Sequence, residues 1–309
     1  MTSAAYVGRA APSPTGDLHM GNLFATACAY ARARRAGGRF VLRIEDVDTP
    51  RTVLGAAQRI EEDLATFGFV FDAGPSRDDG RGPYVQSSST ARYEAALAAL
   101  RARGLVYACR CSRKDLREAS APHGEDGPIY PGTCRALDLP FDDPALPVAW
   151  RFRAPEGAIV VDDALAGRFA HDVARDVGDF IVKRRDGLYA YQLAVVVDDA
   201  HQGVTEIVRG RDLLQSAPRQ VALFRALGRA PPGFAHVPLV VDASGARLSK
   251  RRGDETVRAR LARGEDSHAL LGALAHAVGR AARGSRVSLE ELCALLDDDA
   301  LRVESIALA

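Results

Sequence analysis

Near its start the chain carries Pro12-Ser13-Pro14-Thr15-Gly16-Asp17-Leu18-His19-Met20-Gly21-Asn22, a polar turn that runs into a helical pattern. Proline and glycine exclude regular structure over the first part of this stretch. The helix after the turn begins with unpaired backbone N–H groups and the positive end of its dipole, which favour an anion. His19 and Asn22 add side-chain groups there, and Gly21 permits close approach of a ligand to the backbone. The stretch therefore predicts a phosphate site, although a simple turn with a capping histidine has the same pattern.

Short predicted strands lie on either side of this turn and helix. Residues 5–11 predict a strand before the turn, and Gly37-Gly38 predict the end of the helix. Phe40–Ile44 then predict a buried strand that runs into Glu45-Asp46-Val47-Asp48. Strand, loop, helix and strand within about forty residues is typical of the start of a parallel α/β sheet. We therefore expect an α/β fold with a Rossmann-like parallel sheet.

The remainder of the chain interrupts this pattern once and then resumes it. A second helix is marked by Tyr93, Leu97 and Leu100, and many prolines and short strand-like pieces come after it. The α/β pattern returns with Phe180–Val182, and further apolar segments lie at Leu193–Val197, in a helix near 215–227, and in a strand over Val237–Val241. We divide the chain into a first catalytic half (1–103), an insertion (104–174), a second catalytic half (175–256) and a short helical C-terminal region (257–309).

A second polar stretch, Arg247-Leu248-Ser249-Lys250-Arg251, lies far along the chain. Among 41 basic residues only Lys114, Lys183 and Lys250 are lysines. A mobile ammonium suits reactions in which negative charge develops on phosphate oxygens. A solvated basic loop is the simpler interpretation of this stretch alone. Together with the first stretch, it predicts the two halves of one nucleotide site.

Composition places the chain among ordinary globular proteins and excludes a few classes. Its 309 residues are 47% hydrophobic and 26% charged, and its formal net charge is +1. No apolar run is long enough to cross a bilayer, and no leader pattern opens the chain, so we expect a cytoplasmic protein with no membrane partner. A net charge near zero requires any polyanion to meet a local patch. Candidate phosphate contacts are Arg32, Arg34, Arg35, Arg39, Arg251, Arg252, Arg258 and Arg260. We expect a monomer.

Three of the five cysteines, Cys109, Cys111 and Cys134, lie close together in the insertion. An odd number of cysteines does not suggest a disulfide framework. Three thiolates in one short segment suit tetrahedral Zn²⁺, whose commonest additional ligand would here be His123. Three free, buried thiols are the alternative. We expect the other two, Cys28 and Cys293, to be core residues, because they lie in apolar helical patterns.

With these residues in view, the chain resembles class I aminoacyl-tRNA synthetases, whose two signature motifs correspond to His19–Asn22 and Arg247–Arg251. Within that class Arg9–Gly16, Arg43–Asp48 and Tyr191–Gly210 resemble the glutamyl branch, so the resemblance covers roughly residues 5–255. There are departures, because Asn22 replaces the usual histidine, and Arg247 and Arg251 replace the outer lysine and serine. Such variants are familiar in the glutamyl branch and leave the expected activity in place.

The resemblance implies a set of site residues. It makes His19 and Lys250 catalytic, each stabilising charge on the phosphates of ATP, which is expected to bind with Mg²⁺. The implied ATP contacts are Pro12, Ser13, Pro14, Thr15, Gly16, His19, Gly21, Asn22, Arg247, Leu248, Ser249, Lys250 and Arg251. The implied L-glutamate contacts are Arg9, Ala10, Ala11, Pro12, Ser13, Glu45, Tyr191 and Arg209. Relatives with this cysteine arrangement use a tyrosine four residues before the last cysteine, so the resemblance makes Tyr130 the fourth ligand of one structural Zn²⁺.

The charged residues among these glutamate contacts can bind different groups of the substrate. Glu45 can pair with the ammonium of the substrate, while Arg9 or Arg209 can hold its side-chain carboxylate with two hydrogen bonds. For Glu45 the alternative is an exposed strand end. For Arg209 it is a structural ion pair, such as one with Asp212.

The nucleic acid that accepts glutamate is inferred from the length of chain after the second motif. Only residues 252–309 remain, which is room for a few helices, whereas conventional glutamyl-tRNA synthetases continue into a large anticodon-reading domain. The shorter plan resembles the glutamyl-queuosine branch, which activates glutamate and attaches it to the queuosine base in the anticodon loop of tRNA(Asp). Two alternatives are a minimal glutamyl-tRNA synthetase working with a separate anticodon-binding partner, and a non-catalytic, zinc-bearing RNA-binding paralogue.

Overall fold

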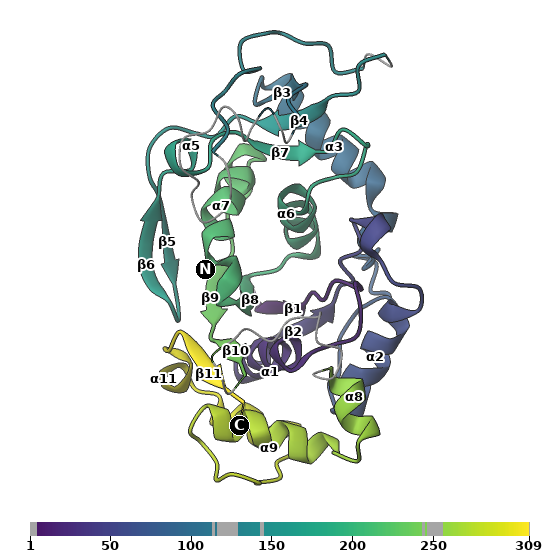
Figure 1. Cartoon of the computed structure of the whole chain (residues 1–309), viewed down its shortest axis with the longest axis vertical. Helices are drawn as coiled ribbons and strands as arrows, with labels where there is room; N and C mark the ends of the chain where they lie inside the picture. The colour runs from purple at the N-terminus through teal and green to yellow at the C-terminus, as the bar shows by residue number, and fades with distance from the viewer. Residues whose placement is uncertain are drawn as a thin grey trace.

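A computed structural model describes residues 5–112, 115, 129–142, 145–242, 245 and 256–308. Its elements form an elongated molecule with parallel strands near the middle (Figure 1). An antiparallel sheet lies at one end of the long axis, and helices of the C-terminal region lie at the other (Figure 1). None of the helices within the described ranges is both long and apolar enough to cross a membrane.

The first parallel pair has the order that the sequence predicts. Strand β1 (Val7–Ala10) pairs with β2 (Arg39–Leu42), and helix α1 (Met20–Arg35) connects them. Glycine follows α1 because the chain must turn sharply there, and Gly37 has a φ of +61°, which glycine adopts without strain. Nine of the 16 residues of α1 are buried, and five of these nine are alanine or cysteine, whose small side chains let neighbouring strands and helices approach closely. The prediction that Cys28 is a core residue is confirmed, and Cys293 is partly buried against the same core.

The second parallel pair comes from the other side of the insertion. Helix α6 (Tyr191–Gln202) leads to strand β8 (Glu206–Gly210), and helix α7 (Ala217–Ala226) leads to strand β9 (Gly233–Val237), which pairs with β8 in parallel. The two pairs lie side by side, because the N–H of Thr205 donates to the carbonyl oxygen of Val7 at 2.9 Å. The fold class, an α/β protein with a parallel sheet, is therefore confirmed.

One antiparallel sheet combines two strands of the predicted insertion with a strand that the sequence assigns to the α/β sheet. Strands β3 (Val106–Cys109), β4 (Ala149–Phe152) and β7 (Phe180–Lys183) form an antiparallel sheet. The prediction that Phe180–Val182 resumes the parallel pattern is therefore wrong, since a short apolar run does not show which strand it pairs with. Conversely, β5 (Ile159–Asp163) pairs with β6 (Gly167–His171) and also meets β9 through Asp163 and Phe234. A short helix, α5 (Val173–Asp176), comes next. The division of the chain into four parts stays a prediction.

Other elements were partly visible in the sequence pattern. Helix α3 (Thr90–Ala102) matches the predicted second helix, whereas helix α2 (Ala56–Thr66) has no counterpart among the predicted elements. The predicted strand over Val237–Val241 is divided at Pro238, and its second part forms β10 (Leu239–Val241), which pairs with β11 (Ser305–Ala307). The C-terminal region is helical as predicted, with α8 (Val257–Ala262), α9 (Ser267–Ala277), α10 (Leu289–Leu295) and α11 (Asp298–Leu301). Three 3-10 turns complete the described elements: Thr49–Arg51, Gln86–Ser88 and Arg211–Ser216.

Candidate active site

A cavity of about 930 Å³ is lined by residues from both parallel pairs. The predicted site residues that line it are Arg9, Ala10, Ala11, Pro12, Ser13, Thr15, His19, Gly21, Asn22, Glu45, Tyr191 and Arg209. Pro14 and Gly16 are not among its lining residues. Gly16 has a φ of +145°, so it serves the shape of the turn. Residues 246–255, which contain Arg247, Leu248, Ser249, Lys250 and Arg251, lie outside the described residues.

Further residues line the cavity that the sequence did not indicate as binding residues. They include Arg51, Asp212, Leu213, Pro238 and Val240. Sequence neighbourhood could have pointed to three of them, because Asp212 and Leu213 follow Arg209 and Arg51 follows the Arg43–Asp48 stretch. Pro238 and Val240 reach the cavity through packing between elements far apart in sequence.

His19 occupies the N-cap of α1. Its Nδ1 accepts a hydrogen bond from the N–H of Asn22 at 3.3 Å, and the side-chain oxygen of Asn22 accepts one from the N–H of His19 at 3.4 Å. Because Nδ1 is an acceptor, a neutral imidazole carries its proton on Nε2. Gly21 makes room for this ring, since a Cβ at that position would lie 3.0 Å from imidazole atoms of His19. The capping role and the predicted donor role of His19 are therefore compatible.

Behind the cavity, four charged side chains form one buried network. The guanidinium of Arg43 donates to Asp199 at 2.7 Å and to Glu45 at 2.9 Å. Arg9 also donates to Asp199, at 3.3 Å, and to the carbonyl oxygen of Val208, at 3.0 Å. Burial raises the pKa of Glu45, although Arg43 and Arg9 act in the opposite direction. The two arginines balance the two carboxylates, so the network holds Arg9 and Glu45 in place at the cavity wall.

Arg209 differs from Arg9 in the charge of its partners. Its guanidinium donates to His236 at 3.0 Å, to the side-chain oxygen of Gln220 at 2.8 Å and to the carbonyl oxygen of Leu213 at 3.2 Å. Within the described part of the chain, these three hydrogen-bond partners offer no negative charge. Burial lowers the pKa of Arg209, and the charge of Arg9 acts in the same direction. A buried cation beside the cavity thus favours a bound anion.

The predicted zinc ligands come together in the insertion. The Sγ atoms of Cys109, Cys111 and Cys134 all lie within 4.8 Å of one another, and those of Cys111 and Cys134 are 3.5 Å apart. The hydroxyl oxygen of Tyr130 lies 3.5 Å from Sγ of Cys109 and 4.0 Å from Sγ of Cys111. Four ligands around Zn²⁺, with Zn–S bonds of about 2.3 Å, have edges of about 3.8 Å between sulfurs. These four side chains could therefore hold a tetrahedral metal ion, and His123 lies outside the described residues.

Arg151 supports the charge that such a cluster would carry. Its Nε donates to Sγ of Cys109 at 3.2 Å, and its guanidinium lies 3.7 Å from the centre of the Tyr130 ring. Burial raises the pKa of the Cys109 thiol, but hydrogen bonds from Tyr130 and Arg151 outweigh burial, so the net shift is downward. A lowered pKa favours the thiolate, which is the form that binds metal.

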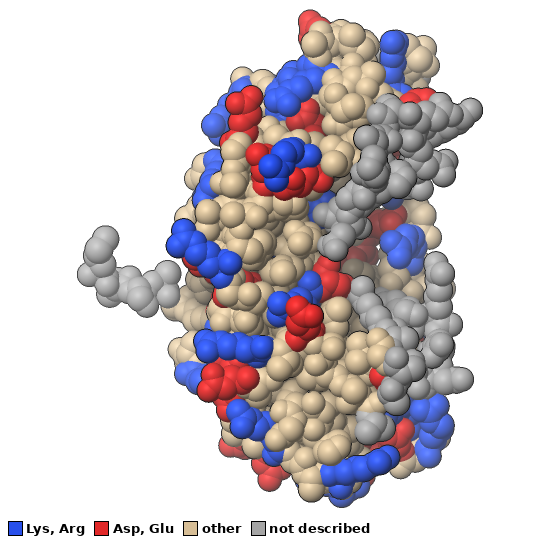
Figure 2. Space-filling model, turned by 60° about the vertical axis from the view of Figure 1, so that its left-hand side comes forward, with Lys and Arg blue, Asp and Glu red and all other residues tan. Residues whose placement is uncertain are grey.

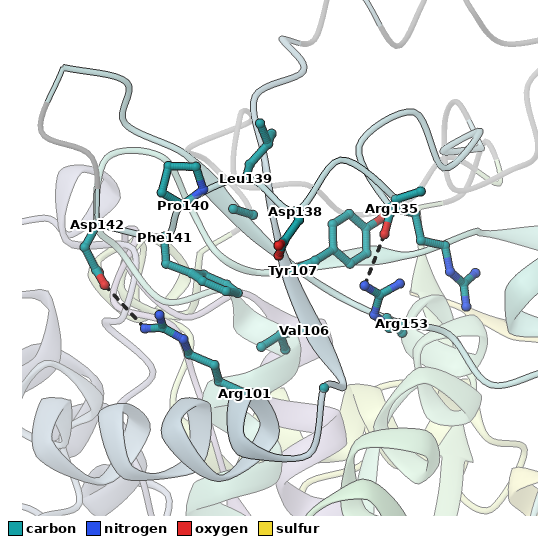
Figure 3. Close-up of a pocket in the computed structure, with 13 residues that line it drawn as sticks. Arg101, Val106, Tyr107, Arg135, Asp138, Leu139, Pro140, Phe141, Asp142 and Arg153 are labelled. Carbon is teal, nitrogen blue, oxygen red and sulfur yellow. Dashed lines mark hydrogen bonds and ion pairs between the residues drawn. The ribbon is translucent and has the colours of Figure 1, made fainter.

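A second hollow, of about 1010 Å³, lies in the insertion and shares no lining residue with the first (Figure 3). Arg101 pairs with Asp142 at 3.3 Å, and Arg153 donates to the carbonyl oxygen of Arg135 at 3.1 Å (Figure 3). It contains none of the predicted ATP or glutamate contacts. We therefore take the smaller cavity as the candidate active site, because the predicted residues gather there.

The arginines predicted to contact phosphates are largely engaged within the molecule. Arg32 pairs with Glu206 at 2.8 Å, Arg258 with Asp63 at 2.8 Å and Arg260 with Glu265 at 2.6 Å. The remaining described members make these contacts: Arg34 with Asp72, Arg39 with Asp79, and Arg35 with the carbonyl oxygens of Cys293 and Leu296. Figure 2 likewise shows basic and acidic side chains interspersed over the face in view. Arg251 and Arg252 lie outside the described residues. RNA contact by these arginines stays a prediction.

The geometry and the comparisons with known proteins agree on the class. The family model for tRNA synthetases class I (E and Q), catalytic domain, matches residues 6–294. The chain therefore belongs to the glutamyl and glutaminyl (E and Q) family of class I tRNA synthetases, which are ligases.

Two curated relatives indicate the branch within this family. The chain is 45% identical over 303 residues to the glutamyl-Q tRNA(Asp) synthetase of Symbiobacterium thermophilum, covering 94% of this chain and 92% of the relative. It is 49% identical over 249 residues to the protein of that name from Neisseria meningitidis serogroup C, covering 80% of each.

Solved structures show the same fold. A glutamate tRNA ligase from Elizabethkingia meningosepticum, in complex with its amino acid, has a TM-score of 0.83 at 24% identity, covering 99% of this chain and 67% of that one. The glutamate-tRNA synthetase of Elizabethkingia anophelis has a TM-score of 0.83 at 25% identity, covering 99% and 68%. The expected class I synthetase fold is thus confirmed.

Proposed function

We propose that this protein activates L-glutamate with ATP and transfers it to the queuosine base in the anticodon loop of tRNA(Asp). In the first step the α-carboxylate of glutamate attacks the α-phosphorus of ATP, which forms glutamyl-adenylate and releases pyrophosphate. In the second, a hydroxyl group of the cyclopentene ring of queuosine attacks the acyl carbon and releases AMP. His19 and Lys250 stabilise charge on the phosphates during the first step.

The observation that carries this proposal is the single cavity in which Arg9, Glu45, Tyr191 and Arg209 lie together with His19. Glutamate has two carboxylates and one ammonium, and the predicted glutamate contacts on the cavity wall include two cations, Arg9 and Arg209, and one acid, Glu45. The acid and Arg9 are already fixed by Arg43 and Asp199, so less ordering is required when the substrate binds.

Support for the nucleotide half comes from the described residues that flank the second motif in sequence. His19 forms a backbone bridge with Thr256, and the N–H of Val257 donates to the carbonyl oxygen of Leu18 at 2.8 Å. On the other side Val240 lines the cavity. Lys250 precedes Thr256 by six residues, a chain length of at most roughly 21 Å. Covalent connectivity therefore allows the ammonium to reach a triphosphate that His19 contacts.

Support for the acceptor comes from the names of the relatives, both of which are called glutamyl-Q tRNA(Asp) synthetase. The solved structures similar in fold belong instead to ligases of glutamate and its own tRNA. We therefore keep a glutamyl-tRNA synthetase, which charges tRNA(Glu), as the second candidate.

An acceptor comparison tests the proposal. Purified protein is given glutamate and ATP without RNA, and pyrophosphate exchange is measured. Labelled glutamate is then offered with queuosine-bearing tRNA(Asp), with tRNA(Asp) lacking queuosine, and with tRNA(Glu). We expect glutamate-dependent exchange and labelling of the first RNA alone.

The other outcomes are equally informative. Labelling of tRNA(Glu) alone identifies the second candidate and rejects the queuosine acceptor. Absence of exchange together with binding of RNA identifies a non-catalytic RNA-binding protein. The tRNA(Asp) lacking queuosine is the matched control, because it differs from the expected substrate in the modified base.

For the cysteine cluster we propose one structural Zn²⁺ held by Cys109, Cys111, Tyr130 and Cys134. All four positions are filled by protein groups, so no place remains for a reacting water, and the ion would stabilise the fold of the insertion. The close approach of the three sulfurs to one another, and of the phenol oxygen to two of them, supports this assignment.

Metal content of purified variants tests the zinc proposal. We expect one zinc ion per chain by mass spectrometry of the metal, and its loss in Cys134→Ser, because two sulfurs and a phenol bind too weakly. Tyr130→Phe should release zinc to a chelator faster than the unsubstituted chain does, whereas His123→Ala should not. Cys293→Ser is the matched control and should retain one zinc. Faster release from His123→Ala, with Tyr130→Phe unchanged, would make His123 the fourth ligand.

A further inference from the structure

Arg209 stands at the end of a chain of buried hydrogen bonds that the expected glutamate site does not include. Strands β8 and β9 place Arg209 and His236 as direct partners in their parallel register. Nε of Arg209 donates to Nε2 of His236 at 3.0 Å, and Nδ1 of His236 lies 2.5 Å from a carboxylate oxygen of Asp163. The side chains of His236 and Asp163 are both fully buried.

The carboxylate of Asp163 is held as an anion by its surroundings. Its Oδ1 accepts from the N–H groups of Leu165 at 3.0 Å, of Ala166 at 2.8 Å and of His236 at 3.1 Å. Burial raises the pKa of Asp163, but these hydrogen bonds and His236 outweigh it and lower the pKa to about 2. Oδ2 is therefore a pure acceptor, so Nδ1 of His236 must carry the proton.

This tautomer determines what His236 can offer to Arg209. With the proton on Nδ1, Nε2 has a free lone pair and accepts from Arg209. A second proton, on Nε2, would point at the N–H of Arg209 and eliminate this hydrogen bond. Burial lowers the pKa of His236 and Arg209 acts in the same direction, while the hydrogen bonds to Asp163 and to the backbone of Leu213 act in the opposite direction; the net shift is downward, which favours a neutral ring. Asp163 thus makes Nε2 of His236 the acceptor that holds the guanidinium of Arg209 in place.

The remaining contacts leave the outer part of the guanidinium available to a ligand. An arginine has five N–H donors. His236, Gln220 and Leu213 take one each in the described part of the chain, and Arg209 lines the cavity. The two N–H donors that remain can hold a carboxylate with two hydrogen bonds. This requires that the plane of the guanidinium is fixed.

We propose that Asp163 and His236 are positioning residues that orient Arg209 toward a carboxylate of the amino-acid substrate. This inference rests on the proposed function, since it presumes that the substrate of the cavity is glutamate. It adds two residues that do not touch substrate and that act through Arg209.

Two variants separate positioning from simple structural support. In Asp163→Asn the three backbone donors occupy the amide oxygen, so the NH₂ group faces the imidazole and selects the Nε2–H tautomer. His236→Asn keeps an N–H donor for Asp163 but lacks the Nε2 atom that accepts from Arg209. Loss of a hydrogen bond to a charged group weakens binding by about 10- to 100-fold. We expect the KM for glutamate in pyrophosphate exchange to rise by that factor in both variants, while the KM for ATP stays within about twofold. His276→Gln, in α9, is the matched histidine control and should change neither constant.

A second measurement does not depend on activity. Nitrogen NMR of the histidine rings should show His236 neutral with its proton on Nδ1 in the unsubstituted chain, and with its proton on Nε2 in Asp163→Asn. A charged ring, or a proton on Nε2 in the unsubstituted chain, overturns the proposal. So does an unchanged KM for glutamate in His236→Asn, or an equal rise in both KM values. If the unsubstituted chain shows no glutamate-dependent exchange, the proposed function fails, and the NMR result still decides whether the hydrogen-bond chain exists.

Discussion

Replacing Arg43 by methionine is expected to lower the free energy of unfolding by about 3–5 kcal/mol, the usual cost of removing one partner from a buried ion pair. The side chain of Arg43 is only 1% exposed and joins Asp199 to Glu45. Burial lowers the pKa of Arg43, but the two carboxylates outweigh burial and raise it, so the guanidinium is charged. Methionine fills much of the volume and leaves both carboxylates without this partner. Urea unfolding monitored by circular dichroism measures the change.

The matched control is Arg175→Met. Arg175 also pairs with an acid, Asp176, at 2.9 Å, but its side chain is 79% exposed. Exposed pairs contribute little, so this variant should lie within about 0.5 kcal/mol of the unsubstituted chain. Equal effects of the two substitutions would contradict the view that the Arg43 network is a buried, charge-balanced support.

The second large effect concerns Lys250. In Lys250→Ala we expect glutamate-dependent pyrophosphate exchange to fall by at least about 10²-fold, the usual effect of removing one group that stabilises developing charge. Binding of glutamate, measured by calorimetry without ATP, should be unchanged, because Arg9, Glu45 and Arg209 remain. Normal pyrophosphate exchange by Lys250→Ala would show that Lys250 has no catalytic role.

Lys183→Ala provides the comparison for this prediction. Lys183 is another of the three lysines; it lies at the end of β7, and its ammonium pairs with Glu94 of α3 at 3.2 Å. It does not line the candidate active site. Exchange by Lys183→Ala should therefore stay within about twofold of the unsubstituted chain, whereas a similar loss in both variants would indicate a general effect of removing a lysine.

Local patterns in the sequence predicted the first strand, helix and strand well, because each is bounded by proline or glycine and shows a regular apolar spacing. The same reasoning failed for β7. A run such as Phe180–Val182 fits a parallel or an antiparallel strand equally, and the choice depends on β4, which lies 28 or more residues earlier. Helix α2 was not predicted, although its apolar residues Ile60 and Leu64 have helical spacing.

The candidate site shows the same contrast between local and distant information. Arg9, Glu45, Tyr191 and Arg209 lie in stretches that resemble a known family, and they meet in one cavity. His236 and Asp163 carry no such pattern. They lie 73 residues apart, and their significance appears only when β5, β8 and β9 are adjacent. Arg43 belonged to a predicted motif, but its role as the link between two buried acids could not be read from one strand.

The adjacency of β1 and β8 has a consequence for synthesis on the ribosome. One edge of β1 is covered at Val7 only after Thr205, which lies 198 residues later, has been synthesised. At about 5–20 residues per second this interval lasts roughly 10–40 s. During that time the nascent chain exposes an unpaired strand edge, which is a preferred site for misassociation. We therefore expect the amino-terminal half to be most prone to misassociation during this interval, until translation supplies β8.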